Sequence, residues 1–184
     1  MASDIGTELN SMVQNIVDEL EAAVSGSLYD VDGNATVIDD MDEWKKAEYA
    51  KEVDAFKASH SPIARLKQGT RYVESAFDPD LYGSFEEFME DEIGTADDID
   101  EPDPISLDEY FRSHNEPLDL YFEVDTQKNL NGGRMQVTAG GPSIWIADDE
   151  VRGYWGSTRV EISLDSETKS AMWDWFEGQW DTVK

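Results

Sequence analysis

The chain contains no cysteine and only two histidines among its 184 residues. Without cysteine, disulfide bonds, thiol catalysis and zinc–thiolate sites are excluded. Neither His60 nor His114 has another histidine at metal-ligand spacing, which argues against a zinc site or a Ser-His-Asp triad. The absence of cysteine also fits a reducing cytosol.

Long apolar runs are missing as well. No segment approaches the roughly 18 apolar residues of a membrane span. The opening residues, MASDIGTELN, lack the basic and then apolar order of a signal peptide. The sequence therefore predicts a cytosolic protein without a membrane-spanning segment.

Basic residues are scarce: 14 stand against 42 acidic ones, and the formal net charge is −28. A small domain stays soluble with a net charge of magnitude about 2 to 8, and a larger excess opposes folding through self-repulsion. We therefore expect a functional reason for the excess. Direct binding to nucleic acid or to an anionic membrane is disfavoured, because phosphate contacts require Lys and Arg.

The charge is unevenly distributed along the chain. Residues 1–44 hold eleven acidic residues and no basic one, whereas residues 45–71 hold seven basic and three acidic residues. Residues 72–125 then hold nineteen acidic residues, with Arg112 as the one basic residue. The basic patch at 45–71 is predicted to pair either with this acidic tract or with another copy in a homodimer.

Residues 118–184 carry the clearest signal of folded structure. Apolar and polar residues alternate in five short segments, which predicts antiparallel strands. Two of the turns are expected at Asn131-Gly132-Gly133 and at Gly140-Gly141-Pro142. A helix follows from Asp165 to Trp180, with Asp165 or Ser166 as its N-cap. The sequence thus predicts an antiparallel β-meander packed against a C-terminal helix.

Residues 1–117 are predicted to be mainly helical and acidic. Apolar residues at helical spacing predict helices over 4–24 and 42–59. Residues 28–38 form either a hairpin turning at Asp32-Gly33 or a loop, and residues 62–73 form either a short basic helix or irregular structure. The fold class is α+β, and the two parts form either two domains or one continuous domain.

The acidic tract contains two further helix starts. Ser84 is a predicted N-cap for a helix over 85–93, with Glu87 completing a capping box. Residues 97–104 hold two prolines and five acidic residues, which is typical of an extended, exposed linker. Ser106 is expected to cap a short helix over 107–113.

No cofactor is predicted. Asp30, Asp32 and Asn34 have the initial spacing of a calcium loop, but Ala35 replaces its glycine and Met41 its final glutamate. A solvated turn is therefore favoured over a cation site. Among 42 acidic residues no catalytic pair can be singled out, so an enzyme using carboxylates and a divalent metal stands as an alternative.

Residues 140–156, GGPSIWIADDEVRGYWG, followed by a short strand and a helix rich in Trp and Phe, carry a family resemblance. The segment resembles the C-terminal module of small acidic proteins carried by bacterial plasmids and phages. In charge density the chain is similar to anti-restriction and anti-CRISPR proteins that imitate DNA. These resemblances imply a mobile-element inhibitor.

The resulting hypothesis is a non-enzymatic protein that occupies the nucleic-acid-binding groove of a host defence enzyme, either a CRISPR effector or a restriction enzyme. Its partner is a basic, nucleic-acid-binding protein. A salt-adapted protein from a hypersaline cytosol, acidic over its whole surface, is the main alternative. The contact surface is expected among the acidic residues between 72 and 125: Glu86, Glu87, Glu90, Asp91, Glu92, Asp97, Asp98, Asp100, Glu101 and Asp103.

Overall fold

The computed structural model describes residues 2–60, 77, 78 and 80–184. They divide into two compact units, one formed by Met1–Ile38 with Pro102–Lys184 and the other by Asp39–Glu101. We call the first the sheet unit and the second the helical unit. The predicted basic or irregular segment at 62–73, with Arg65, Lys67 and Arg71, lies outside the described residues.

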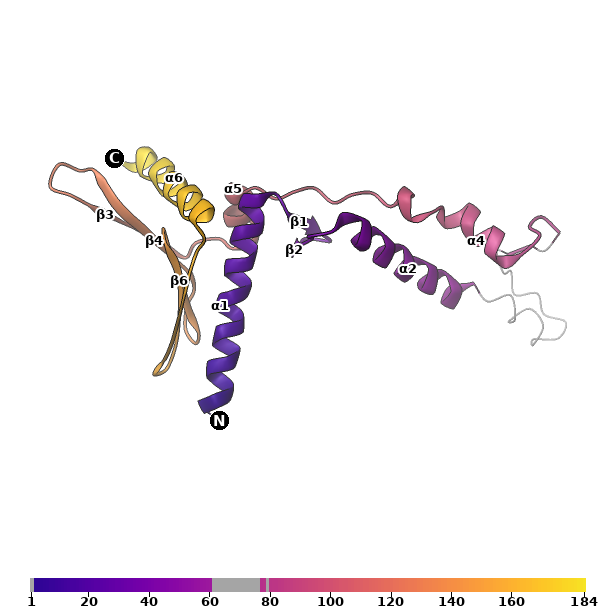
Figure 1. The fold of residues 1–184 in the computed structure, drawn as a ribbon, viewed down its shortest axis with the longest axis horizontal. Helices are drawn as coiled ribbons and strands as arrows, with labels where there is room; N and C mark the ends of the chain where they lie inside the picture. Colours follow the sequence, from indigo (N-terminus) through magenta and orange to yellow (C-terminus); the bar gives the residue numbers. More distant parts are fainter. Residues whose placement is uncertain (1, 61–76, 79) are drawn as a thin grey trace. The chain divides into compact units, whose positions relative to one another are not determined.

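The sheet unit contains a five-stranded antiparallel meander in which each strand pairs with the next along the chain (Figure 1). This confirms the predicted α+β fold class. The strands are β3 (Asp119–Val124), β4 (Leu130–Thr138), β5 (Ser143–Ala147), β6 (Glu150–Trp155) and β7 (Thr158–Ser163).

One face of this sheet is apolar. The strand register aligns an apolar residue from every strand in a single row: Leu120, Met135, Ile146, Val151 and Ile162. Because successive side chains of a strand point to opposite faces, the residues between these positions lie on the other side of the sheet.

Two helices, α1 (Ala2–Ser25) and α6 (Ser166–Val183), cover the apolar face. α1 packs against β6 and β7, while α6 packs against β4. The predicted N-cap of α6 is confirmed, since the Asp165 carboxylate accepts a 2.7 Å hydrogen bond from the Thr168 amide. By packing on these strands, both helices bury their apolar stripes against the same face of the sheet.

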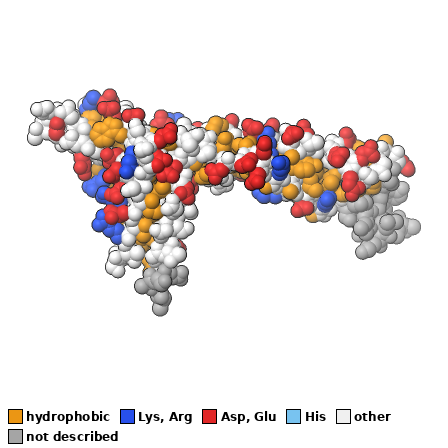
Figure 2. All heavy atoms as spheres, viewed as in Figure 1, with side chains coloured by type: hydrophobic (Ala, Val, Ile, Leu, Met, Phe, Trp, Pro, Cys, Tyr) orange, Lys and Arg blue, Asp and Glu red, His pale blue; other side chains and the backbone are white. Residues whose placement is uncertain are grey.

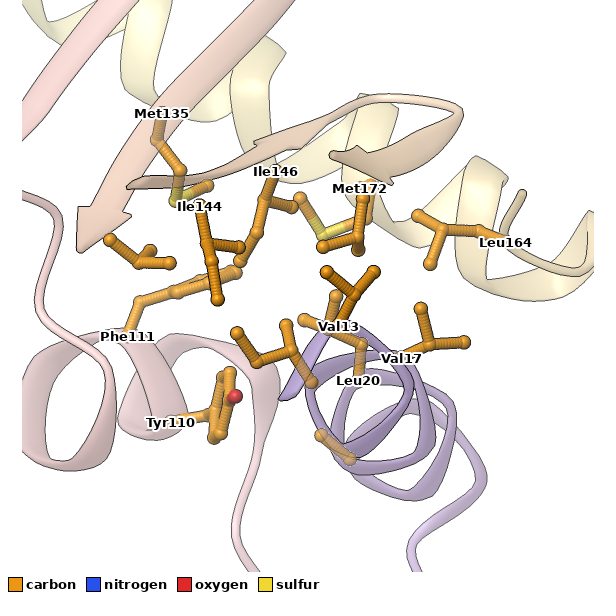
Figure 3. Packing of buried hydrophobic residues seen from close by; sticks show 14 of the residues in the cluster. Val13, Val17, Leu20, Tyr110, Phe111, Met135, Ile144, Ile146, Leu164 and Met172 are labelled. Atoms are coloured by element: carbon orange, nitrogen blue, oxygen red, sulfur yellow. The ribbon is translucent and has the colours of Figure 1, made fainter. Parts of the chain in front are cut away.

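The core of the sheet unit lies between these layers. Figure 3 shows Val13 and Leu20 of α1 near Met172 of α6 and Ile146 of β5. All four side chains are fully buried. Tyr110 closes the core, and its hydroxyl donates a 2.6 Å hydrogen bond to the Glu19 carboxylate.

The predicted turn at Asn131-Gly132-Gly133 is wrong, because these residues lie inside β4. The turn is instead built around Asp125, whose carboxylate accepts hydrogen bonds from the Gln127 and Asn129 amides at 2.7 and 2.8 Å. Position 133 requires glycine because Phe176 of α6 packs directly on it, and a Cβ at this position would overlap the ring.

Of the two alternatives predicted for residues 28–38, a hairpin and a loop, the structure shows the hairpin. β1 (Leu28–Val31) and β2 (Asn34–Val37) pair in antiparallel fashion. Asp32 and Gly33 have φ angles of 53° and 80°, the positive values that a two-residue hairpin turn requires.

The segment 102–114 returns to this hairpin. The Ile105 amide donates to the Leu28 carbonyl at 2.8 Å. The predicted cap at Ser106 is confirmed by a hydrogen bond from the Glu109 amide. The chain then forms α5 (Leu107–Glu109) and the π-helical turn η2 (Tyr110–His114), rather than one regular helix.

Within the described residues, the helical unit contains α2 (Met41–Ser59), α4 (Phe85–Ile93) and the 3₁₀ turn η1 (Ala96–Asp98). Of these helices, α2 buries no residue, whereas α4 buries Phe88 and Met89. The ring of Phe88 lies 5.4 Å from that of Phe56 and 4.9 Å from that of Tyr82, centroid to centroid. Aromatic packing therefore holds α4 against α2.

No helix in the described ranges combines the length and the apolar character that crossing a membrane requires.

Replacing Gly133 by alanine is expected to lower the free energy of unfolding by about 1–3 kcal/mol, because the new methyl group must displace Phe176. Gly178→Ala is the matched control: it lies in α6 with nothing within 4 Å of its Cβ position. This control should raise stability by about 0.5–1 kcal/mol, as glycine weakens a helix interior. Denaturant unfolding followed by circular dichroism measures both, and equal effects would contradict the packing described.

Candidate functional site

The ten acidic residues predicted as a contact surface are all exposed. Nine lie in the helical unit, and Asp103 lies in the sheet unit. Five of the nine belong to α4. The structure therefore gathers half of the predicted residues on one helix of nine residues.

The N-terminus of α4 is fixed by its cap. The Ser84 hydroxyl accepts a 3.0 Å hydrogen bond from the Glu87 amide, as predicted. The Glu87 carboxylate accepts from the Gly83 amide at 2.9 Å, one residue earlier than a capping box requires. Glu86 and Glu87 also meet the positive end of the helix dipole.

Burial of the opposite side orients the carboxylates. At 3.6 residues per turn, Glu86, Glu87, Glu90 and Asp91 occupy the side of α4 opposite Phe88 and Met89. We call these four residues the acidic face. Because Phe88 and Met89 are 2% and 7% exposed, packing of this pair holds the acidic face toward solvent.

The charge density of α4 is more than half that of duplex DNA. Its nine residues carry five carboxylates and no basic side chain. At a rise of about 1.5 Å per residue, this gives roughly one negative charge per 2.7 Å of helix axis. Duplex DNA carries one per ~1.7 Å of its axis.

Like charges within α4 lie at the spacing that weakens a helix. Glu86 and Glu90 are four residues apart, as are Glu87 and Asp91. Pairs of equal charge at this spacing are destabilising, so a partner that supplies positive charge would stabilise the helix.

Four of the ten predicted residues have internal partners: Glu87 accepts from the Gly83 amide, Asp91 accepts a 3.4 Å hydrogen bond from the Tyr82 hydroxyl, and Asp98 and Glu101 are also paired. The amide and hydroxyl of Thr95 donate to Asp98 Oδ2 at 2.7 and 2.9 Å. The backbone bond, reinforced by the hydroxyl, holds the pKa of the Asp98 carboxyl below its usual range. Glu101 forms a 2.8 Å ion pair with Lys45 of α2.

The Lys45–Glu101 ion pair is one instance of the predicted internal pairing between the basic patch and the acidic tract. Its hydrogen bond raises the pKa of Lys45. Lys51 pairs with its neighbour Glu48 instead. Lys46 and Lys57 are exposed on the same helix, so most of α2's positive charge faces solvent.

The two histidines, and Asp30 of the calcium-loop pattern, each contact a neighbouring residue. His60 stacks on Phe56 with ring centroids 4.2 Å apart, and His114 Nε2 lies 3.8 Å from a carboxylate oxygen of Asp30. The other oxygen of Asp30 accepts from the Gly33 amide within the hairpin turn. Within the described residues, no group of three or more His, Cys, Asp or Glu side chains could hold a metal ion.

Sequence reasoning did not identify the sheet face opposite the helices. There, the Arg134 guanidinium lies 5.5 Å from the ring centroids of both Tyr121 and Trp145. Arg152 pairs with Glu150 and, at 3.4 Å, with Glu161. Figure 2 shows basic and acidic side chains intermixed on the side of this unit away from α1. In the sequence, this face of the sheet is indicated by the alternation of polar Arg134 with apolar Met135, because successive residues of a strand point to opposite faces.

No protein-family model, curated protein or solved structure matches this chain. Residues 140–156, which carry the resemblance to plasmid and phage proteins, form β5, β6 and the adjoining turns. The resemblance stays a prediction.

Asp98→Ala is expected to accelerate amide hydrogen exchange at Thr95, because the alanine removes the acceptor that orders η1. The folded-state pKa of Asp98 is lowered, so its stabilisation is present above the ordinary aspartate pKa and is lost as pH falls through the lowered value. Carboxyl NMR titration measures this pKa. Asp97→Ala is the control, and equal acceleration in both variants would contradict the assigned role.

Proposed function

We propose that the helical unit is a non-enzymatic docking module whose acidic face occupies the positively charged nucleic-acid-binding groove of a partner protein. The observation that carries the proposal is the geometry of α4. Phe88 and Met89 are buried on one side, and four carboxylates project from the other with no basic residue on the helix. The resemblance to DNA-imitating inhibitors favours a CRISPR effector or a restriction enzyme as the partner.

Electrostatics favours this use of the helix. A groove that binds DNA presents Lys and Arg at the spacing of phosphates, and a helix with more than half the line charge of DNA can compete for them. Complementary fields raise the association rate. Affinity should therefore fall as added salt screens the charges, over a Debye length of about 10 Å at 0.1 M.

Local order also supports docking. Ser84 fixes the first turn of α4, and the aromatic contacts of Phe88 fix the side that faces solvent. Since the carboxylates are carried by an already folded helix, binding orders fewer groups than it would on an unstructured acidic segment.

Salt adaptation is a second candidate, and one observation favours it. Figure 2 shows acidic side chains on the visible surface of both units, not on the helical unit alone. A docking module must be folded at low salt, where attraction to a groove is strongest. A chain that is folded in about 0.1 M KCl favours docking, whereas folding only in molar KCl favours salt adaptation.

Reversing three charges tests the docking function. Glu86→Lys, Glu90→Lys and Asp91→Lys together should leave the fold intact and abolish inhibition of a DNA-cleaving enzyme that the unaltered chain inhibits. DNA cleavage by a panel of restriction endonucleases and CRISPR effector nucleases is measured with each protein, at low and high salt. Added duplex DNA should relieve the inhibition competitively.

The matched control reverses three exposed acids of α6, Asp174, Glu177 and Asp181, and so makes the same change in net charge. This control variant should inhibit as the unaltered chain does. Undiminished inhibition by the α4 variant would contradict the assignment of the acidic face. Equal loss in both variants would show that overall charge, rather than α4, attracts the enzyme.

A further inference from the structure

β3 is an edge of the five-stranded sheet, since it pairs with β4 and with no other strand of the described residues. Leu118, Tyr121 and Val124 are 58%, 44% and 43% exposed within and beside this strand. The strand itself contains neither lysine nor proline, two residues that commonly prevent an edge from pairing with another chain. Unpaired backbone groups and exposed apolar side chains therefore lie together.

The two faces of β3 differ in chemistry. Leu120 and Phe122 lie on the helix-covered face, where Phe122 contacts Trp180 with ring centroids 5.4 Å apart. Asp119, Tyr121 and Glu123 alternate with them on the opposite face. A strand added beside β3 would have apolar neighbours on one face and carboxylates on the other.

We propose that β3 binds an extended segment of a partner protein in which apolar residues alternate with Lys or Arg. The segment adds a strand to the sheet through backbone hydrogen bonds, a mode in which side-chain pockets set specificity. Its basic residues lie beside Asp119 and Glu123. Its apolar residues lie on the face shared by Leu120 and Phe122.

Charge disfavours a second copy of this chain as the occupant in two registers. Antiparallel self-pairing centred on Tyr121 places Asp119 opposite Glu123, and pairing centred on Phe122 places Asp119 opposite Asp125. Like charges directly opposite each other destabilise a strand pair. The carboxylates of β3 thus oppose self-association and favour a basic strand.

This proposal does not rest on the docking function of α4, because β3 lies in the sheet unit and the acidic face in the helical unit. Either surface can lose binding without the other, and the two sets of variants separate them.

Fluorescence anisotropy with synthetic nine-residue peptides tests the proposal on the full chain. A peptide of alternating Val and Lys should bind, and one of alternating Val and Glu should not. Two N-methylated forms of the Val–Lys peptide, one blocked at every Lys amide and the other at every Val amide, distinguish strand pairing from general attraction. One form should lose binding and the other should retain it, because alternate amides point to opposite edges of a strand.

Asp119→Lys with Glu123→Lys should weaken binding of the Val–Lys peptide about tenfold. Glu52→Lys with Asp54→Lys makes the same change in net charge at two exposed positions of α2, and it should alter the affinity less than about twofold. Equal weakening in the two double variants would overturn the proposal. Undiminished binding of both N-methylated peptides to the unaltered chain would also overturn it, whether or not the variants fold.

Discussion

Repulsion among carboxylates constrains every element of this protein. With a net charge of −28, folding must bury enough apolar surface to offset that repulsion. In the sheet unit, α1 and α6 do so by packing on one sheet face, closely enough that glycine is required at Gly133 and Gly153. In the helical unit the buried surface is smaller, and Phe88 and Met89 determine which carboxylates α4 directs to solvent.

The same constraint gives the two units different surfaces. α4 has no basic residue, so no side chain of the helix itself neutralises its carboxylates. The sheet face opposite the helices has arginines next to its acids, and Arg152 already pairs with Glu150 and Glu161. β3 also carries carboxylates, and these lie on a sheet edge that has unpaired backbone groups. The two proposals place the positive charge of a partner against a helix in one unit and against a strand in the other.

Features set by neighbouring residues could be predicted from the sequence. Alternation located the strands, and the caps at Ser84 and Asp165 followed from residue type and position. Features that depend on residues distant in the sequence could not be predicted. Asn131-Gly132-Gly133 has the composition of a turn, yet it lies in β4, where glycine is required at 133 because Phe176 occupies the space above it. For the candidate site, charge predicted exposure of the ten acids, but the partner of Glu101 is Lys45, far away in the sequence. The Asp98 cap was predictable, since Thr95 precedes it by three residues.

The proposed function depends on direct contact between α4 and the DNA-binding groove of a partner. Zero-length carbodiimide cross-linking, which joins a carboxylate to a lysine amine in direct contact, tests this claim most directly once an inhibited nuclease is in hand. The account predicts cross-links from Glu86, Glu90 or Asp91 to lysines that line the DNA-binding groove, and their disappearance when duplex DNA is added. Cross-links that start from α6 or α1 instead, or that persist in the presence of DNA, would contradict it.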